Sequence, residues 1–345
     1  MKKRFGALLM TAIVAISFAG CSSSNDSASS GETSSSSTAS VSSGSTSSTT
    51  FPKKPIQIIC PVKAGGDTDY NTRVFAQYLS KYLDTDVVVT NVEGGATILG
   101  MQQVLDGAPD GYTLVVNGLD AYIPNMMGTT DVTIDSFKTV GIPLFDNTTV
   151  LVANSKSGYK DLADVVERTK ENPRTIEYGM KVGAANQIYG VAMDSVWGSA
   201  FKPMDVGNNS AKLTALLGEQ TDTAVLSYAL AKDYFETGEF QALCLLGADR
   251  NPLLPDVPVP ADYGLENIDC SKWFWFGVHP DTPDEIIDIL SDAFEKVTQD
   301  EEYIKTMEAN YLTVDYIAKE EAHDYANTFF EETLLPYKDE FLAQQ

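Results

Sequence analysis

Short apolar runs alternate with amphipathic stretches from residue 56 onward, and this alternation limits the folds open to the chain. The run at 56–60 is typical of a buried strand, and apolar residues at helical spacing follow at 74–83. A second strand is predicted at 87–89, a second helix at 98–105 and a third strand at 112–116. A β-α-β-α-β order implies parallel pairing with right-handed crossovers. The sequence therefore predicts an α/β fold.

The same alternation starts again near residue 149 and predicts a second α/β lobe. Strands are expected at 149–154, 175–179, 223–227 and 240–246, and helices at 161–172, 186–197, 210–217 and 229–237. We place one lobe at 51–150 plus 249–345 and the other at 151–248.

The C-terminal part is expected to be mostly helical from Pro283 onward, with a short strand near 312–317. Before it, the aromatic run at 273–276 alternates in a way that favours a core strand or a hinge strand. A platform for a sugar or an aromatic ligand is the alternative interpretation of this run.

A glycine-containing loop joins the first predicted strand to the first predicted helix. Ligands of open parallel sheets bind beyond the carboxyl ends of the strands, where such loops lie. Glycines let the backbone approach a ligand, and the next helix offers free N–H groups and the positive end of its dipole. Either this loop binds a carboxylate or phosphate, or Gly65-Gly66 makes a tight turn while Thr68 or Asp69 caps the helix. The candidate residues are Lys63, Ala64, Gly65, Gly66, Asp67, Thr68 and Asp69.

A second strand-to-helix loop, in the other predicted lobe, has the same combination of small and polar residues. Either it binds the ligand as well, or Asn186 simply caps the following helix. Two such loops from two lobes would face each other across a cleft and present backbone amides to a single solute. The candidate residues are Gly179, Met180, Lys181, Gly183, Ala184, Asn186 and Gln187.

The N-terminus has the features of a targeting signal. Three basic residues precede an apolar stretch at 5–19, which is shorter than the roughly 20 residues that a membrane span needs. Residues 18–21 (Phe-Ala-Gly-Cys) resemble a bacterial lipobox, with phenylalanine where leucine is usual. We expect a lipoprotein signal peptide at 1–20 and a lipid on Cys21. A plain secretory signal or an uncleaved anchor is the alternative.

A tether is predicted at residues 21–50. Residues 22–50 hold 16 Ser and 5 Thr, too little apolar surface to offset the entropy of ordering. The chain carries a net charge of -24, so anionic lipid would repel it and the lipid itself must provide the membrane anchor. We expect an extracytoplasmic protein, lipid-anchored to the bacterial cell membrane.

The excess of acidic residues argues against a nucleic-acid partner, because binding phosphate needs a basic surface. The two histidines, His279 and His323, are too few for a multi-histidine zinc site. Residues 67–71 match the start of an EF-hand loop, but Thr72 and Tyr78 stand where that loop needs Gly and Glu. We predict no cofactor and no metal. An extracytoplasmic hydrolase is a rival hypothesis, although the sequence has no Gly-x-Ser-x-Gly motif.

The cysteines other than Cys21 form no CxxC pair. Cys60 and Cys244 lie in apolar runs and are expected to be buried, inert thiols. Cys270 lies in a polar stretch, where it is either free or bridged to Cys244.

Several motifs resemble one known family, and they occur in that family's order from residue 51 to the C-terminus. The most specific is 108–114 (Ala-Pro-Asp-Gly-Tyr-Thr-Leu), and 51–59, 254–258 (Leu-Pro-Asp-Val-Pro) and 275–277 (Trp-Phe-Gly) also match. Together with the loop around Gly65-Gly66, they make the body similar to the substrate-binding proteins of tripartite tricarboxylate transporters, the Bug family.

This resemblance implies a two-lobed periplasmic-binding-protein fold of type II, with a hinged cleft. It implies a receptor, not an enzyme, that captures a small organic carboxylate and delivers it to a transporter with a large and a small integral membrane subunit. Carried over onto this sequence, the ligand loops are 63–69 and 179–187. Asn208 lies at the position of a third cleft loop, although the local sequence differs from the family's usual Pro-Tyr-Lys-Gly. We expect a monomer.

Departures from the family pattern leave the ligand open. Lys63 either pairs with a substrate carboxylate or faces solvent, and the same choice applies to Lys181. Asp67 replaces a glycine and places a negative charge beside a proposed anion site. It caps the helix, neutralises Lys63 or binds a ligand amine, and the last role would favour an amino acid or another zwitterion.

Overall fold

Residues 50–344 are described by the structure, a computed structural model, and these residues belong to one compact unit. The predicted signal peptide, Cys21 and all but the last residue of the predicted tether lie outside the described residues and stay predictions. None of the helices in the described part is long and apolar enough to cross a membrane.

A six-stranded sheet within residues 50–344 contains the first three predicted strands. Its order is β13-β4-β12-β3-β1-β2, and β1 pairs in parallel with both β2 and β3, as predicted. β12 is antiparallel to β3 and β4. The strand predicted near 312–317 is much shorter and includes only the last of those residues. The strands are β1 (Ile56–Cys60), β2 (Val87–Asn91), β3 (Thr113–Asn117), β4 (Lys138–Ile142), β12 (Trp275–Val278) and β13 (Ile317–Ala318).

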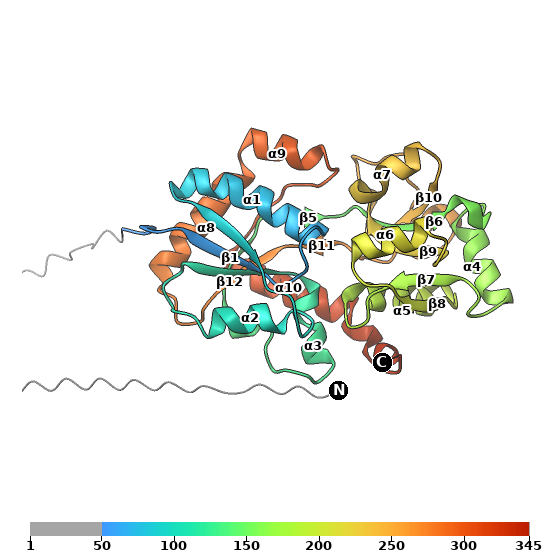
Figure 1. Cartoon of the computed structure of the whole chain (residues 1–345), viewed down its shortest axis with the longest axis horizontal. Helices are drawn as coiled ribbons and strands as arrows, with labels where there is room; N and C mark the ends of the chain where they lie inside the picture. The colour runs from blue at the N-terminus through green and yellow to red at the C-terminus, as the bar shows by residue number, and fades with distance from the viewer. Residues whose placement is uncertain (1–49, 345) are drawn as a thin grey trace, which may run out of the picture. The chain divides into compact units, whose positions relative to one another are not determined.

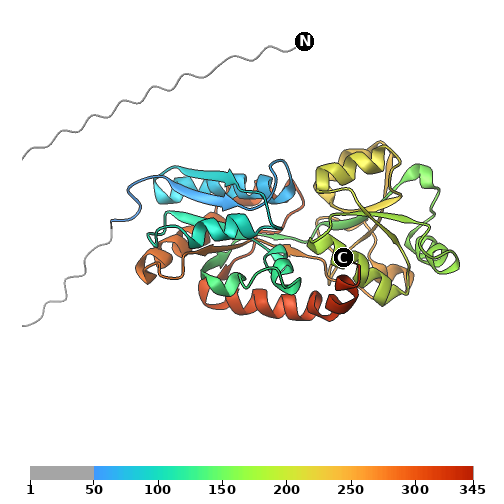
Figure 2. The ribbon, with the colours of Figure 1, turned by 60° about the horizontal axis from the view of Figure 1, so that its bottom comes forward.

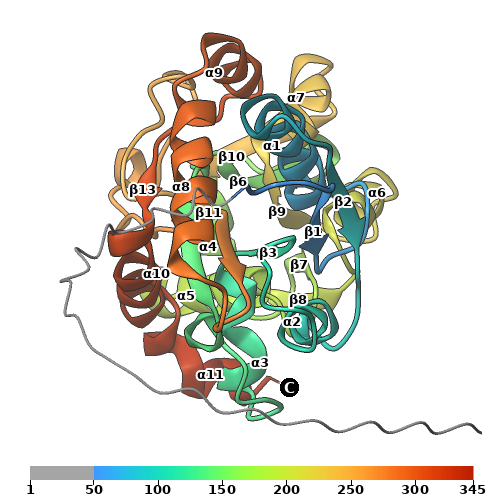
Figure 3. The same ribbon diagram turned by 90° about the vertical axis from the view of Figure 1, so that its left-hand side faces the viewer.

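Helices cover both faces of this sheet, because successive strand residues point to opposite sides. Ile58 belongs to a buried cluster with α1, α8 and α9, whereas Ile59 belongs to a second cluster with α2, α3 and α10. Figure 3 shows α1 and α9 in the upper part of the view and α2, α3 and α10 in the lower part. The helices are α1 (Asp67–Leu83), α2 (Ile98–Leu105), α3 (Ile123–Met126), α8 (Asp284–Thr298), α9 (Glu301–Glu308) and α10 (Lys319–Thr333). α1 begins before the apolar spacing does, since its first turn holds acidic residues that the helix dipole favours.

A five-stranded sheet, also within the described residues, has the order β10-β6-β9-β7-β8. β7 pairs in parallel with β8 and β9, while β6 is antiparallel to β9 and to β10. α4 and α5 pack on one face, and α6 and α7 pack on the other. The elements are β6 (Thr149–Asn154), β7 (Glu177–Met180), β8 (Lys202–Asp205), β9 (Thr223–Ser227), β10 (Phe240–Leu245), α4 (Leu162–Glu171), α5 (Ala185–Trp197), α6 (Asn209–Leu217) and α7 (Tyr228–Glu236).

Two short antiparallel strands carry the chain between the sheets. β5 (Phe145–Asp146) leads from β4 to β6, and β11 (Lys272–Trp273) leads from β10 back to β12. In Figure 1 they lie between the blue and orange elements of the first sheet and the green and yellow elements of the second. β11 and β12 confirm the core or hinge strand predicted at 273–276, and Trp275 is fully buried. Our lobe boundaries near 150 and 248 stay predictions.

The C-terminal segment, from residue 319 onward, contacts a strand of the first sheet and a helix that covers the second. α10 lies on β4, and α11 (Lys338–Leu342), after the short turn η5 (Leu335–Tyr337), packs against α5. Figure 2 shows this red segment running below the first sheet toward the second. The segment therefore gives the two halves a connection in addition to β5 and β11.

Cys60, Cys244 and Cys270 are all buried and free, so the Cys244–Cys270 bridge is not formed. Of the two alternatives for Cys270, the free thiol is the one found, and it is buried although the stretch around it is polar. Its backbone N–H binds Leu246 and its carbonyl accepts from Thr149, which fixes the residue inside the core. Burial raises the pKa of the Cys60 thiol to about 12 and also raises the pKa values of Cys244 and Cys270.

We therefore expect these three thiols to be unreactive toward a thiol-specific reagent at pH 8 in the folded protein, because only the thiolate reacts. After unfolding in denaturant without reductant, all three are expected to react. Peptide mass spectrometry identifies the labelled residues. Labelling of Cys60 alone in the unfolded protein would contradict the prediction and indicate the bridge.

Candidate functional site

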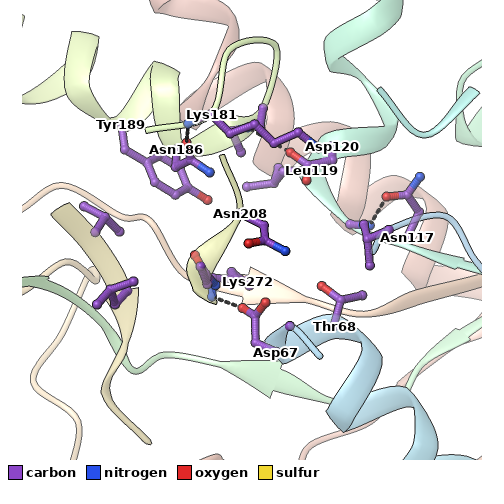
Figure 4. Close-up of a pocket in the computed structure, with 18 of the residues that line it drawn as sticks. Asp67, Thr68, Asn117, Leu119, Asp120, Lys181, Asn186, Tyr189, Asn208 and Lys272 are labelled. Carbon is purple, nitrogen blue, oxygen red and sulfur yellow. Dashed lines mark hydrogen bonds and ion pairs between the residues drawn. The ribbon is translucent and has the colours of Figure 1, made fainter. Parts of the chain in front are cut away.

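A cavity of about 140 Å³ lies between the two sheets, at the carboxyl ends of their parallel strands (Figure 4). The loops after β1, β3 and β7 line it, together with the start of α6, the end of β9 and the β11–β12 connection. This is the place where an open α/β sheet binds its ligands. The lining residues are Val62, Lys63, Gly66, Asp67, Thr68, Asn117, Gly118, Leu119, Asp120, Lys181, Ala184, Ala185, Asn186, Tyr189, Asn208, Asn209, Lys212, Val225, Leu226, Lys272, Trp273 and Phe274.

Both predicted loops contribute to this cavity, and so does Asn208. Eight of the predicted residues line it, namely Lys63, Gly66, Asp67, Thr68, Lys181, Ala184, Asn186 and Asn208. The other predicted residues do not line it: Ala64, Gly65, Asp69, Gly179, Met180, Gly183 and Gln187.

Four of these non-lining residues hold the loops in shape. The Gly65 N–H donates to Asp69 Oδ2 at 3.0 Å, and the Gly183 N–H donates to Gln187 Oε1 at 2.9 Å. In each loop the acceptor therefore lies four residues further along, on the following helix. Both glycines have positive φ, which glycine adopts without strain.

Three helices of the described part point their N-termini at the cavity. Their N-cap residues are Gly66 for α1, Ala184 for α5 and Asn208 for α6, and all three line the cavity. Neither Gly66 nor Ala184 caps its helix with a side chain, whereas Asn208 accepts from the Ala211 N–H at 3.1 Å. Three positive dipole ends thus converge on one small volume, an arrangement that favours an anion.

A network of charged and polar groups borders the cavity and joins four segments. Lys272 of β11 forms ion pairs with Asp67 of α1 and with Asp146 of β5, the latter at 3.2 Å. Lys272 Nζ also donates to Ser227 Oγ at 2.9 Å, and this hydroxyl lies 3.0 Å from Asp146 and 3.2 Å from Asp67. Ser227 ends β9, so the network connects the second sheet, both connecting strands and α1, which packs on the first sheet.

The pKa values in this network follow from the ion pairs. Burial alone would raise the pKa of Asp67, but the charge and hydrogen bond of Lys272 outweigh it and lower the pKa to about 2. Burial would lower the pKa of Lys272, but Asp146 and Asp67 raise it instead. Asp67 is therefore neutralised by Lys272, a residue that the sequence analysis did not single out, rather than by Lys63.

Lys212 on α6 is buried beside the cavity, with 1% of its surface exposed. Its ammonium donates to the Val225 carbonyl at 2.5 Å, and no carboxylate within residues 50–344 forms an ion pair with it. Burial, followed by repulsion from Lys272, lowers the pKa of Lys212 to about 7.

Asp120 belongs to the short turn η1 (Leu119–Ala121) after β3. Its carboxylate accepts from the Ala185 N–H at 2.8 Å and so links the first sheet's side to the N-terminus of α5. Burial raises its pKa, although the Ala185 N–H and the charge of Lys181 act against the rise. Among the described residues no lysine or arginine forms an ion pair with Asp120.

Fourteen lining residues were not named as candidates, although one of them, Ala185, lies within the predicted loop 179–187. Only some of the others carried a local signal. Those at 117–120 follow a predicted parallel strand, so the rule that identified the two loops applies to them as well. Lys212 lies inside a predicted helix and Lys272 beside an apolar strand, where nothing local marks them. Within the described residues, no group of three or more His, Cys, Asp or Glu side chains is placed to hold a metal ion.

Comparison with known proteins identifies relatives along most of the chain. The model of the tripartite tricarboxylate transporter family receptor matches residues 71–334. The protein BugT of Bordetella pertussis is 26% identical over 270 residues, covering 76% of this chain and 82% of BugT. A UPF0065 protein from the gbd 5' region of Cupriavidus necator is 30% identical over 251 residues, covering 71% of this chain and 75% of that protein.

Solved structures resemble this one as well. MatC of Rhodopseudomonas palustris, with bound malate, has a TM-score of 0.72 at 19% identity and covers 85% of this chain and 100% of MatC. A second protein of that organism, with adipate, has a TM-score of 0.75 at 17% identity and covers 85% and 98%. The periplasmic binding protein BugD has a TM-score of 0.71 at 20% identity and covers 84% and 97%. The likeness confirms the predicted two-lobed periplasmic-binding-protein fold.

Proposed function

The chain belongs to the tripartite tricarboxylate transporter receptor family, and from this premise we propose that it captures a small organic carboxylate outside the cytoplasm and delivers it to a tripartite tricarboxylate-type membrane transporter. The family and fold are those of solute-binding receptors. In this proposal the solute is released unchanged, and a large and a small membrane subunit receive it.

The convergence of the α1, α5 and α6 N-termini on one cavity supports an anionic ligand. Backbone N–H groups and dipole ends stabilise a carboxylate there without any metal or cofactor. Lys63, Lys181 and Lys212 add positive charge that no ion pair with a described residue neutralises.

The small volume of the cavity supports a ligand of few carbon atoms. At about 140 Å³ it lies below the ~300–1,000 Å³ typical of sites for drug-sized ligands. Two proteins of this fold contain malate and adipate, which are dicarboxylates of that size. We propose a dicarboxylate of this kind, with an amino acid or another zwitterion as the second candidate.

Delivery of the solute would depend on a membrane anchor and on a hinge between two lobes. A lipid on Cys21 and the tether at 21–50 would keep the receptor at the membrane. The paired strands β5 and β11 are the proposed hinge between a lobe of residues 51–150 plus 249–345 and a lobe of residues 151–248. Closure around a ligand would then present one conformation to the transporter.

Replacing Gly66 by leucine is expected to abolish ligand binding without unfolding the protein. The φ of Gly66 is -92°, which any residue adopts, and an added Cβ would meet only the Lys63 carbonyl, at 3.9 Å. The remaining leucine atoms would extend from a position that lines the cavity. Thermal-shift measurements with malate, succinate and adipate test this, since a ligand at 100 times its Kd adds about 2.7 kcal/mol of stability.

Two controls accompany this variant. Gly66→Ala adds only the tolerated Cβ, and Ala64→Leu adds the same bulk at an exposed position outside the cavity. Both are expected to keep most of the ligand-induced shift. An undiminished shift in Gly66→Leu would remove the first loop from the site, and the absence of a shift in the unmodified protein with every carboxylate would contradict the proposed function.

A further inference from the structure

We propose that Lys212 selects the ligand, by pairing its buried ammonium directly with a carboxylate group of the solute. The inference rests on the proposed function and deepens it, because it names the cation that would distinguish a carboxylate from a neutral solute of the same shape. It concerns a position inside a helix, in a part of the sequence that belongs to neither predicted loop.

The first argument is the uneven distribution of ion pairs around the cavity. Lys272 forms ion pairs with both Asp67 and Asp146. Lys212 forms an ion pair with neither, and its ammonium donates a hydrogen bond to one backbone carbonyl. The carboxylate of Asp67 is occupied by two hydrogen-bonding partners, Lys272 and Ser227. The buried positive charge of Lys212 therefore has no counterion in the described part of the chain, and a carboxylate ligand would supply one.

The second argument is the unfavourable free energy of burying the Lys212 ammonium without a counterion. Lys212 is 1% exposed as a whole residue, and its ammonium makes one hydrogen bond to a carbonyl, so the charge loses much of its hydration without a compensating ion pair. Its place near the N-terminus of α6 adds the unfavourable end of the helix dipole. Ala215 and Leu216, three and four residues further along α6, are also buried, and an apolar side chain at position 212 would suit this buried face as well. A structural role alone thus gives no reason for a lysine, whereas anion binding does.

The proposal predicts a specific pH dependence. The charged groups that act on Lys212 are Asp67 from α1, Asp120 from η1 and Lys272 from β11, with Lys63 and Lys181 on other parts of the cavity wall. Burial and Lys272 lower the pKa of free Lys212 to about 7, and a bound carboxylate would raise it. Affinity should be nearly constant below pH 7 and weaken by up to about tenfold per pH unit above it, because only the protonated fraction binds.

Isothermal titration calorimetry of the full chain with malate, succinate and adipate between pH 6 and 9 tests the proposal. Lys212→Met keeps the length of the side chain and removes the charge, so we expect about 100-fold weaker binding at pH 6 and no weakening between pH 7 and 9. Lys202→Met is the matched control, because Lys202 is an exposed lysine of β8, paired with Glu177 outside the cavity. We expect this control to retain the unmodified protein's affinity and pH profile.

The outcomes separate the inference from the function on which it rests. Carboxylate binding by the unmodified protein with unchanged affinity in Lys212→Met would overturn the inference and leave the proposed function intact. Failure of the unmodified protein to bind any of the three would overturn both. If Lys212→Met did not fold, the pH profile of the unmodified protein would decide, and a flat profile from pH 6 to 9 would reject the role of Lys212.

Discussion

Replacing Lys272 by methionine is expected to lower the free energy of unfolding by about 3–5 kcal/mol at pH 7.5. Among residues 50–344, Lys272 is the one cation that forms ion pairs with Asp67 and Asp146. Asp146 is buried, with 1% of its surface exposed, and would be left as a charge without a cationic partner. Urea unfolding followed by circular dichroism measures the loss.

The same variant should show a pH dependence of known sign. In the unmodified protein, Lys272 lowers the pKa of Asp67 from 3.8 to about 2. The pair's contribution is therefore present above about pH 4 and is lost as the pH falls through about 2. In Lys272→Met the Asp67 carboxylate loses the charge that lowers its pKa and protonates at higher pH, so the deficit relative to the unmodified protein shrinks as the pH falls from 7.5 to 4.5.

Lys202→Met serves again as the control, since its exposed ion pair with Glu177 is worth less than about 1 kcal/mol. The double variant Asp67→Asn, Lys272→Met should recover part of the lost stability, because one of the two unpaired carboxylates is gone. Equal stability of Lys272→Met and Lys202→Met would show that the network does not hold the connecting strands in place.

Replacing Asp120 by asparagine should change the ligand preference in a direction that distinguishes the two ligand candidates. Asp67 is neutralised by Lys272, so Asp120 is the carboxylate that remains available to a ligand in the cavity. Removing its charge should strengthen the binding of a dicarboxylate by about tenfold, since a like charge is lost. The same change should weaken the binding of an amino acid whose ammonium pairs with Asp120.

Asparagine retains an oxygen that can accept from the Ala185 N–H, so the link between η1 and α5 is preserved. Asp205→Asn is the control, because Asp205 is exposed near the second loop and does not line the cavity. Calorimetry with succinate and with aspartate measures both preferences. Unchanged affinities for both ligands in Asp120→Asn would place the ligand away from η1.

The sequence determined the features that depend on neighbouring residues. Alternating apolar runs specified β1, β3, β6 and β9 nearly to the residue, because burial of a strand is encoded in five or six consecutive side chains. Ligands of open α/β sheets bind beyond the carboxyl ends of the parallel strands, and this rule identified two loops that both line the cavity. The motifs at 108–114 and 254–258 indicated the family, which the match over residues 71–334 confirms.

The pairing of distant charges and the burial of Cys270 depend on the packing of the whole chain. Lys272 and Asp67 lie 205 positions apart in the chain, and Asp120 and Ala185 lie 65 apart. Their contacts depend on how the two sheets are joined through β5 and β11. Local patterns carry no information on such distances, so they left the partner of Asp67 and the burial of Cys270 open. Electrostatic energy depends on separation in space, whereas periodicity reports only separation along the chain.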